Sequence, residues 1–171
     1  MVHAADDGWD GGGTRLHYQF YGDLGTALTQ WANLERAIFW VFSHAFAHPE
    51  RGRSAEIFYA VQFHQKVALT TQALESSGTA PDAMTEWRQL AERARRHSAT
   101  RNKLAHWVVT GNAADDGRDR YRLHPPNEGY GYPGALTVAD FQPIWTRFNE
   151  LAQEIEDFWQ RLVPQNAPPV L

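Results

Sequence analysis

The residues of this chain that are best suited to chemistry lie within six positions, from Arg101 to His106. The guanidinium of Arg101 is a fixed positive charge with a planar fork of donors, which suits a phosphate group. The imidazole of His106 can accept or release a proton near neutral pH. The carboxamide of Asn102 can orient either partner through hydrogen bonds. Together these side chains predict a site that holds a phosphate group and moves a proton beside it.

The three residues lie near the end of a segment whose periodicity predicts a helix over residues 83–106. On an ideal helix Asn102 and His106 share a face, but Arg101 and His106 lie about 140° apart. One chain would then hold half of a site, so we expect a homodimer that completes it. The alternative is structural: Arg101 pairs with a carboxylate inside the protein, and His106 caps the helix C-terminus, where a cation is favourable.

A carboxylate, Glu35, falls near the middle of the apolar stripe of a helix predicted over residues 23–46, with Asp23 as its N-cap. Burying an unpaired carboxylate is costly. Arg101 would satisfy Glu35 if the two helices pack together, so we predict that Glu35 holds Arg101 in the site. The alternative is a helix at an edge of the fold, with Glu35 reaching water.

The rest of the chain predicts the elements around these two helices. Residues 54–77 form a helix with Ser54 as its N-cap, and its face with Ile57 and Val61 also carries His64, which we interpret as an interior or interface histidine. Residues 107–110 and 120–123 indicate a β-hairpin or an extended excursion. Thr137 begins a capping box that starts a final amphipathic helix, which ends before Pro164.

These elements predict an all-α fold, an up-down bundle of about four long helices with a short β-hairpin or extended excursion between the third and the fourth. We expect one helical domain over residues 18–163. The Gly- and Asp-rich residues 1–17 predict a flexible leader, and the Pro-rich residues 164–171 predict a loose tail.

Composition sets further limits. The 171 residues are 43% hydrophobic and include no cysteine, which excludes disulfides and thiolate metal sites and fits a cytoplasmic protein. No apolar run has the length that spans a bilayer, so we expect no membrane association. The net charge of −4 argues against a polybasic nucleic-acid binder, yet residues 82–107 carry six Lys and Arg against three acids. Neither a phosphate loop nor an HExxH pattern occurs, so we expect no cofactor and no metal.

The sequence Arg101-x4-His106 resembles the R-x4–6-H signature of the HEPN superfamily, the higher eukaryote and prokaryote nucleotide-binding domains. The resemblance is most specific at Arg101, Asn102, Ala105 and His106, and the helical layout is similar over residues 20–163. It implies a metal-independent endoribonuclease in which two copies of the motif meet in a dimer cleft. It further implies that His106 transfers a proton, that Arg101 clamps the phosphate and that Asn102 orients His106 or a phosphate oxygen.

The chain departs from one branch of that superfamily. Toxin members that are paired with a nucleotidyltransferase antitoxin carry Tyr two residues after the histidine, and here that residue is Val108. Control by nucleotide transfer is therefore not expected, although a protein inhibitor remains an expectation. The alternative function is a non-catalytic dimerisation module or a nucleotide- or RNA-binding module, which the acidic remainder of the chain and its aromatic-rich helices favour.

Overall fold

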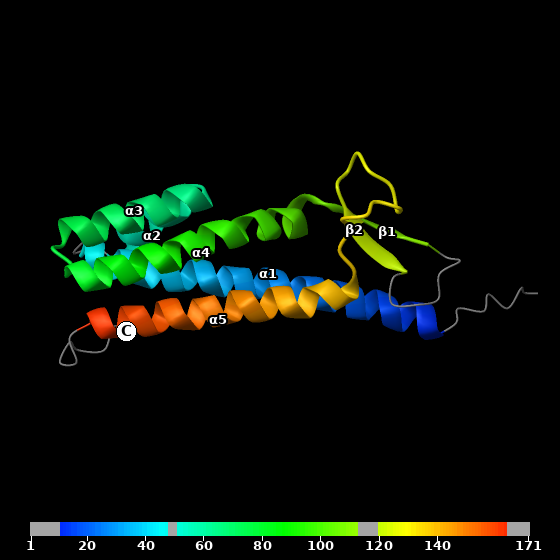
Figure 1. Ribbon diagram of the computed structural model, residues 1–171, viewed down its shortest axis with the longest axis horizontal. Coiled ribbons are helices and arrows are strands. Elements are labelled where there is room, and N and C mark those ends of the chain that lie inside the picture. Colours follow the sequence, from blue (N-terminus) through cyan, green and yellow to red (C-terminus); the bar gives the residue numbers. More distant parts are fainter. Residues whose placement is uncertain (1–10, 48–50, 113–119, 164–171) are drawn as a thin grey trace, which may run out of the picture.

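The computed structural model describes residues 11–47, 51–112 and 120–163, which form an elongated helical bundle with a small sheet (Figure 1). Its helices and strands, in chain order, are α1 (Gly11–Phe46), α2 (Arg51–Tyr59), α3 (Phe63–Ser76), α4 (Pro81–His106), β1 (Val108–Gly111), β2 (Tyr121–His124) and α5 (Val138–Leu162). The prediction of an all-α fold with a short hairpin before the last helix is confirmed.

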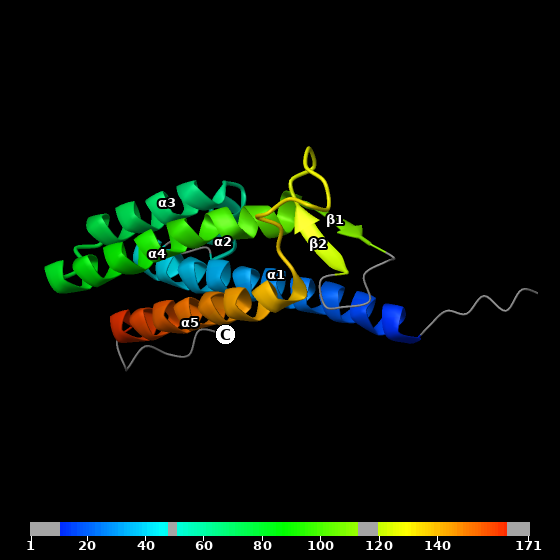
Figure 2. The same ribbon diagram turned by 45° about the vertical axis from the view of Figure 1, so that its right-hand side comes forward.

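Helix α1 is the centre of this arrangement, because it contacts each of the other helices described. Helix α5 lies alongside α1 and runs in the same direction, whereas α4 runs in the opposite direction (Figures 1 and 2). Apolar residues of both helices recur at helical spacing and are buried in the core. They include Phe20, Trp31, Leu34, Ile38 and Phe42 of α1 and Phe141, Phe148, Leu151, Ile155 and Phe158 of α5. Each fully buried side chain of this kind contributes about 1.5–3 kcal/mol.

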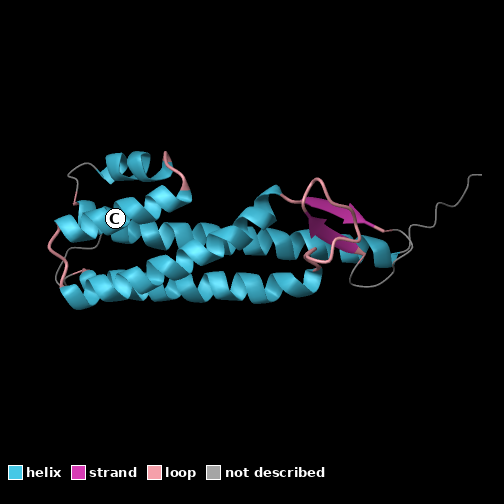
Figure 3. Ribbon diagram, turned by 45° about the horizontal axis from the view of Figure 1, so that its top comes forward, coloured by secondary structure: helices cyan, strands magenta, loops and turns pink. Residues whose placement is uncertain are grey.

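The connection between α4 and α5 has the two features expected of it. Strands β1 and β2 pair in antiparallel fashion, with Val108 opposite His124. Figure 3 shows this hairpin at one end of the bundle, beside the first half of α1. The backbone N–H of Thr137 then donates to Oδ2 of Asp140 over 2.8 Å, and the predicted capping box starts α5.

Helix α1 is longer than predicted. It begins at Gly11, so Asp23 lies inside it and residues 11–17, expected in the leader, are helical. The reason is that the apolar stripe continues towards the N-terminus through Phe20, which is 1% exposed and packs against Phe141 with 5.0 Å between ring centroids. The other residues of the expected leader, 1–10, and the expected tail, 164–171, lie outside the described residues.

The predicted helix over residues 54–77 is wrong. Two helices, α2 and α3, replace it, and Ser54 lies within α2 instead of capping it. The chain turns at residues 60–62, where the backbone N–H of Gln62 donates to Oε1 of Gln65 over 3.0 Å and starts α3. This local cap competes with a continuous helix. It also resets the phase of the helix, so a different set of side chains faces the core.

None of the helices that the structure describes combines the length and the apolar character that crossing a membrane requires.

Candidate functional site

Three helices and the turn before α3 line an open cleft of about 470 Å³. Helix α4 ends on one side of it and α3 begins on another, while α1 contributes Trp31 and Glu35. All four of the predicted site residues line this cleft: Glu35, Arg101, Asn102 and His106. The sequence therefore identified side chains that the fold brings together.

The contribution of α4 comes from one broad face of its last turns. Ser98, Asn102 and His106 are four residues apart and lie nearly above one another, while Arg101 lies at the edge of the same face. Arg101 and His106 therefore reach the same cleft of a single chain, although their angular separation predicted half a site. Because both are present without a second copy, this separation no longer argues for a dimer.

The predicted pairing of Glu35 with Arg101 is wrong. Glu35 accepts instead from Nζ of Lys66 over 2.8 Å and from Nε1 of Trp31 over 2.7 Å. Among the ion pairs of the described residues, with a limit of 4.0 Å, none joins Glu35 to Arg101. The alternative of a solvated carboxylate does not hold either, since the side chains of Lys66 and Glu35 are only 9% and 16% exposed.

The new partner, Lys66, is almost enclosed. Its Nζ lies 5.3 Å from the ring centroid of Phe58 and 5.1 Å from that of Tyr59, distances at which an ammonium is attracted to an aromatic face. Burial raises the pKa of the Tyr59 hydroxyl, and the nearby Glu35 carboxylate raises it further. The charge of Lys66 is therefore balanced inside the protein, and the turn before α3 is what brings it opposite Glu35.

Arg101 is left as the unbalanced cation of the cleft. Its Nη1 donates to Oδ1 of Asn102 over 3.3 Å, and no carboxylate in the described part of the chain forms an ion pair with it. The guanidinium is half-buried and lies at the surface of the cleft. Since Glu35 and Lys66 cancel, the described lining carries one net positive charge when its histidines are neutral. This arrangement suits a singly charged anion.

Two histidines line the cleft, and both are exposed. His106 is the last residue of α4, and His64 is the second residue of α3. The sequence interpretation of His64 was an interior or interface histidine, and the interior alternative is wrong because it assumed one helix over residues 54–77. The buried face of α3 instead carries Lys66, Val67 and Thr70, so His64 lies outside the core. The Gln62 and Gln65 cap was the signal that could have revealed this.

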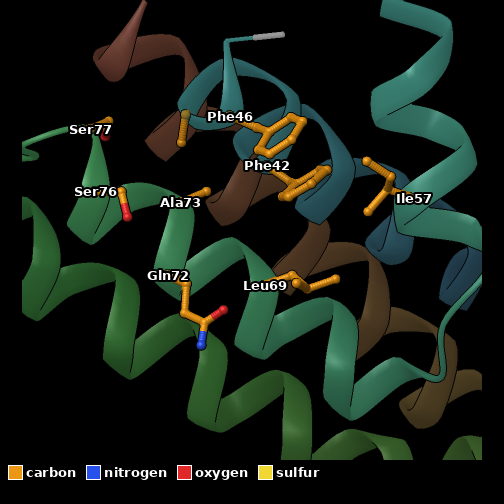
Figure 4. Close-up of a pocket in the computed structure, with 9 residues that line it drawn as sticks. Phe42, Phe46, Ile57, Leu69, Gln72, Ala73, Ser76 and Ser77 are labelled. Atoms are coloured by element: carbon orange, nitrogen blue, oxygen red, sulfur yellow. The ribbon is translucent and has the colours of Figure 1, made fainter.

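A second hollow, of about 420 Å³, lies between the C-terminal part of α1, α2 and the second half of α3. Figure 4 shows the stacked rings of Phe42 and Phe46 with Ile57 and Leu69 at its walls. Its lining holds no ionisable side chain. We assign no chemistry to this hollow. The candidate site is the polar cleft that Arg101 and His106 line.

Within the described residues, no three or more His, Asp and Glu side chains gather in a way that could hold a metal ion. The chain matches no protein-family model, no curated protein and no solved structure in the comparisons made. Function is therefore argued from the cleft itself.

Proposed function

We propose that the chain is an HEPN-like endoribonuclease, in which the cleft binds one phosphodiester of RNA and cleaves it without a metal. One observation carries the proposal: an arginine without a carboxylate partner among the described residues lines a single cleft with Asn102 and His106. Arginine binds two phosphate oxygens at once through its fork of donors. The resemblance of the motif to the HEPN signature agrees with this chemistry.

The reaction has three demands. The ribose 2′-OH attacks the adjacent phosphorus and loses its proton, the bond from phosphorus to the 5′-oxygen breaks, and that oxygen gains a proton. The products are a 2′,3′-cyclic phosphate and a free 5′-OH. His106 serves in proton transfer, since an imidazole exchanges protons near neutral pH. Arg101 stabilises the negative charge that grows on the phosphate oxygens in the transition state.

Asn102 and Glu35 support these two groups. A guanidinium only donates, so the contact from Nη1 of Arg101 fixes the carboxamide oxygen of Asn102 as the acceptor. The amide N–H groups of Asn102 are then the part of that side chain suited to a phosphate oxygen. Glu35 has no direct contact with the phosphate. Its carboxylate neutralises Lys66 and accepts from Trp31, and because of these contacts it does not pair with Arg101.

The test is an RNA-cleavage assay in the presence of a chelator, with His106→Ala and His44→Ala compared side by side. His44 is an exposed histidine in the last turn of α1 and is not part of the cleft lining. We expect cleavage by the wild type, products ending in 2′,3′-cyclic phosphate, and a loss of about 10²–10⁴-fold in His106→Ala only. An unchanged rate in His106→Ala would remove His106 from the mechanism.

A non-catalytic RNA- or nucleotide-binding module is the second candidate. It is favoured by one observation: among the described residues, no hydrogen bond or ion pair orients the His106 ring, and catalytic histidines are usually held by a partner. This candidate predicts binding of RNA that weakens with salt and no cleavage across several RNAs. Loss of that binding in Arg101→Ala, without turnover by the wild type, would support it over the nuclease.

The homodimer follows from the resemblance and remains part of the proposal. A second copy would bring a second motif to the cleft and a group that could orient His106. Light scattering coupled to size-exclusion chromatography measures the mass in solution. A mass of one chain at the concentrations at which RNA is cleaved would contradict the dimer but not the nuclease.

A further inference from the structure

The mechanism proposed above gives no role to His64, the exposed histidine of α3. His64 lies on the lining of the same cleft as Arg101 and His106, but it comes from a different helix. Its ring is at the surface and is not part of the buried face of α3. A structural role in the core is therefore excluded, and the imidazole is accessible to a molecule in the cleft.

Cleavage of RNA by its own 2′-OH needs two proton transfers on opposite sides of the phosphorus. One group takes the proton from the 2′-OH, and another gives a proton to the departing 5′-oxygen. A single histidine can do both only in succession. Two histidines carried by two helices can supply a base and an acid at the same time. The arginine of the cleft then holds the phosphate oxygens.

The ends of the two helices distinguish the histidines. A helix N-terminus carries a partial positive charge and a C-terminus a partial negative one, so cations are favoured at C-termini. His106 is the last residue of α4, at the C-terminal end of that helix. His64 is the second residue of α3, at the N-terminal end of that helix, whose first turn contains no acidic residue.

We propose that His64 is the general base and His106 the general acid of the nuclease, an inference that rests on the function proposed above. A neutral ring nitrogen of His64 takes the 2′-OH proton as the bond from the 2′-oxygen to phosphorus forms. The His106 imidazolium gives its proton to the 5′-oxygen as the bond from phosphorus to that oxygen breaks. Arg101 keeps its proton throughout, and the two histidines exchange charge states in one turnover.

A substrate with a good leaving group separates the two roles. In an RNA dinucleotide whose bridging 5′-oxygen is replaced by sulfur, the departing thiolate needs no proton. We expect His106→Ala to lose about 10²–10⁴-fold on the oxygen substrate and to recover most of the wild-type rate on the sulfur substrate. We expect His64→Ala to lose a similar factor on both substrates, because the 2′-OH still has to be deprotonated.

The control is His44→Ala, which should match the wild type on both substrates, and thermal melting should show that each variant folds. His64→Gln serves as a second variant that keeps a polar side chain in the first turn of α3. Wild-type rates for both His64 variants would overturn the proposal. So would a His64→Ala defect that sulfur relieves, or a His106→Ala defect that sulfur does not relieve.

These results also separate this inference from the function it depends on. If the wild type cleaves but the His64 variants cleave equally well, the base is another group and the nuclease stands. If the wild type cleaves neither substrate, the nuclease itself fails and the assignment of both histidines fails with it.

Discussion

Helix α4 carries arginines near both ends, but these arginines differ in whether a carboxylate lies near them. Near the N-terminal end and middle of the helix, four arginines lie within 4.0 Å of a carboxylate: Arg88, Arg93, Arg95 and Arg96. Near the C-terminal end, Arg101 has no such partner among the described residues. Lys103, close by, lies over the ring of Trp107 at 5.0 Å from the centroid.

Which arginine of α4 is left without a carboxylate partner therefore depends on the neighbouring helices. Arg93 pairs with Glu154 of α5, while Glu35 of α1, which lines the same cleft as Arg101, is paired with Lys66 of α3. Four of the six Lys and Arg side chains of residues 82–107 therefore lie near a carboxylate, and two of these four share Glu92. One uncompensated arginine in a cleft is a more specific feature than a patch of paired ones.

Removing Lys66 should have the largest effect on this difference between Arg101 and the paired arginines. Lys66→Ala leaves the Glu35 carboxylate mostly buried without its cation, and losing one member of a buried pair costs about 3–5 kcal/mol. It also frees Glu35 to attract Arg101, so RNA cleavage should fall as well. Urea unfolding measures the first effect. Adding Glu35→Gln to Lys66→Ala should restore much of the stability, and a loss below about 1 kcal/mol in Lys66→Ala would contradict a buried pair.

Arg101→Ala should separate function from stability. We expect cleavage to fall by about 10²–10³-fold, because one donor to the transition-state charge is lost. The free energy of unfolding should change by less than about 0.5 kcal/mol, since Arg101 forms no ion pair with any residue that the structure describes. Arg93→Ala is the matched control, with an unchanged cleavage rate. Equal cleavage defects in both variants would mean that α4 acts as a general basic surface.

The contribution of the Arg93 and Glu154 pair to stability should depend on pH. The hydrogen bond from Arg93 holds the pKa of Glu154 below its usual range, with 2.8 Å between Nη2 and Oε1. A carboxylate with a lowered pKa in the folded protein stabilises it above the unfolded pKa of about 4.3, and this contribution is lost as the pH falls through the folded pKa. Both groups are well exposed, so Glu154→Gln should cost below about 1 kcal/mol at pH 7 and nothing at low pH.

The smallest effect is expected at His97, between the two ends of α4. Burial, and then the charges of Arg147, Arg93 and Arg96, lower the pKa of the His97 imidazole. A neutral ring is thus favoured in the folded protein. The stability is present above about pH 6.5 and is lost as the pH falls from there through the lower folded pKa. Wild type and His97→Gln should diverge by below about 0.5 kcal/mol over that range, and a divergence that grows towards high pH would contradict it.

Local pattern predicted much of the fold. The capping box at Thr137, the hairpin after His106 and the long amphipathic helix α5 depend on near neighbours in the chain, and all three are confirmed. The start of α1 could not be predicted in this way. Burial of Phe20 against α5 and the hairpin extends the helix through a segment whose glycines argued for a leader.

The candidate site shows the same limit. The residues Arg101, Asn102 and His106 were found because they adjoin one another on one helix. The partner of Glu35 was missed because Lys66 is 31 positions away, and its approach depends on the turn between α2 and α3. The exposure of His64 on the cleft could not be predicted for the same reason, since a helix assumed to be continuous placed it on the face with Ile57 and Val61.

The ion pair between Glu35 and Lys66 also bears on which phosphate of the proposed RNA substrate the cleft would suit. With that pair neutral inside, Arg101 offers one positive charge to a ligand. A linkage within an RNA strand carries one negative charge, whereas a terminal phosphate carries close to two near neutral pH. In the proposed nuclease this single charge matches an internal linkage better than a strand end, provided that both histidines are neutral when the RNA binds. A capped or circular RNA should be cut as readily as a linear one with free ends.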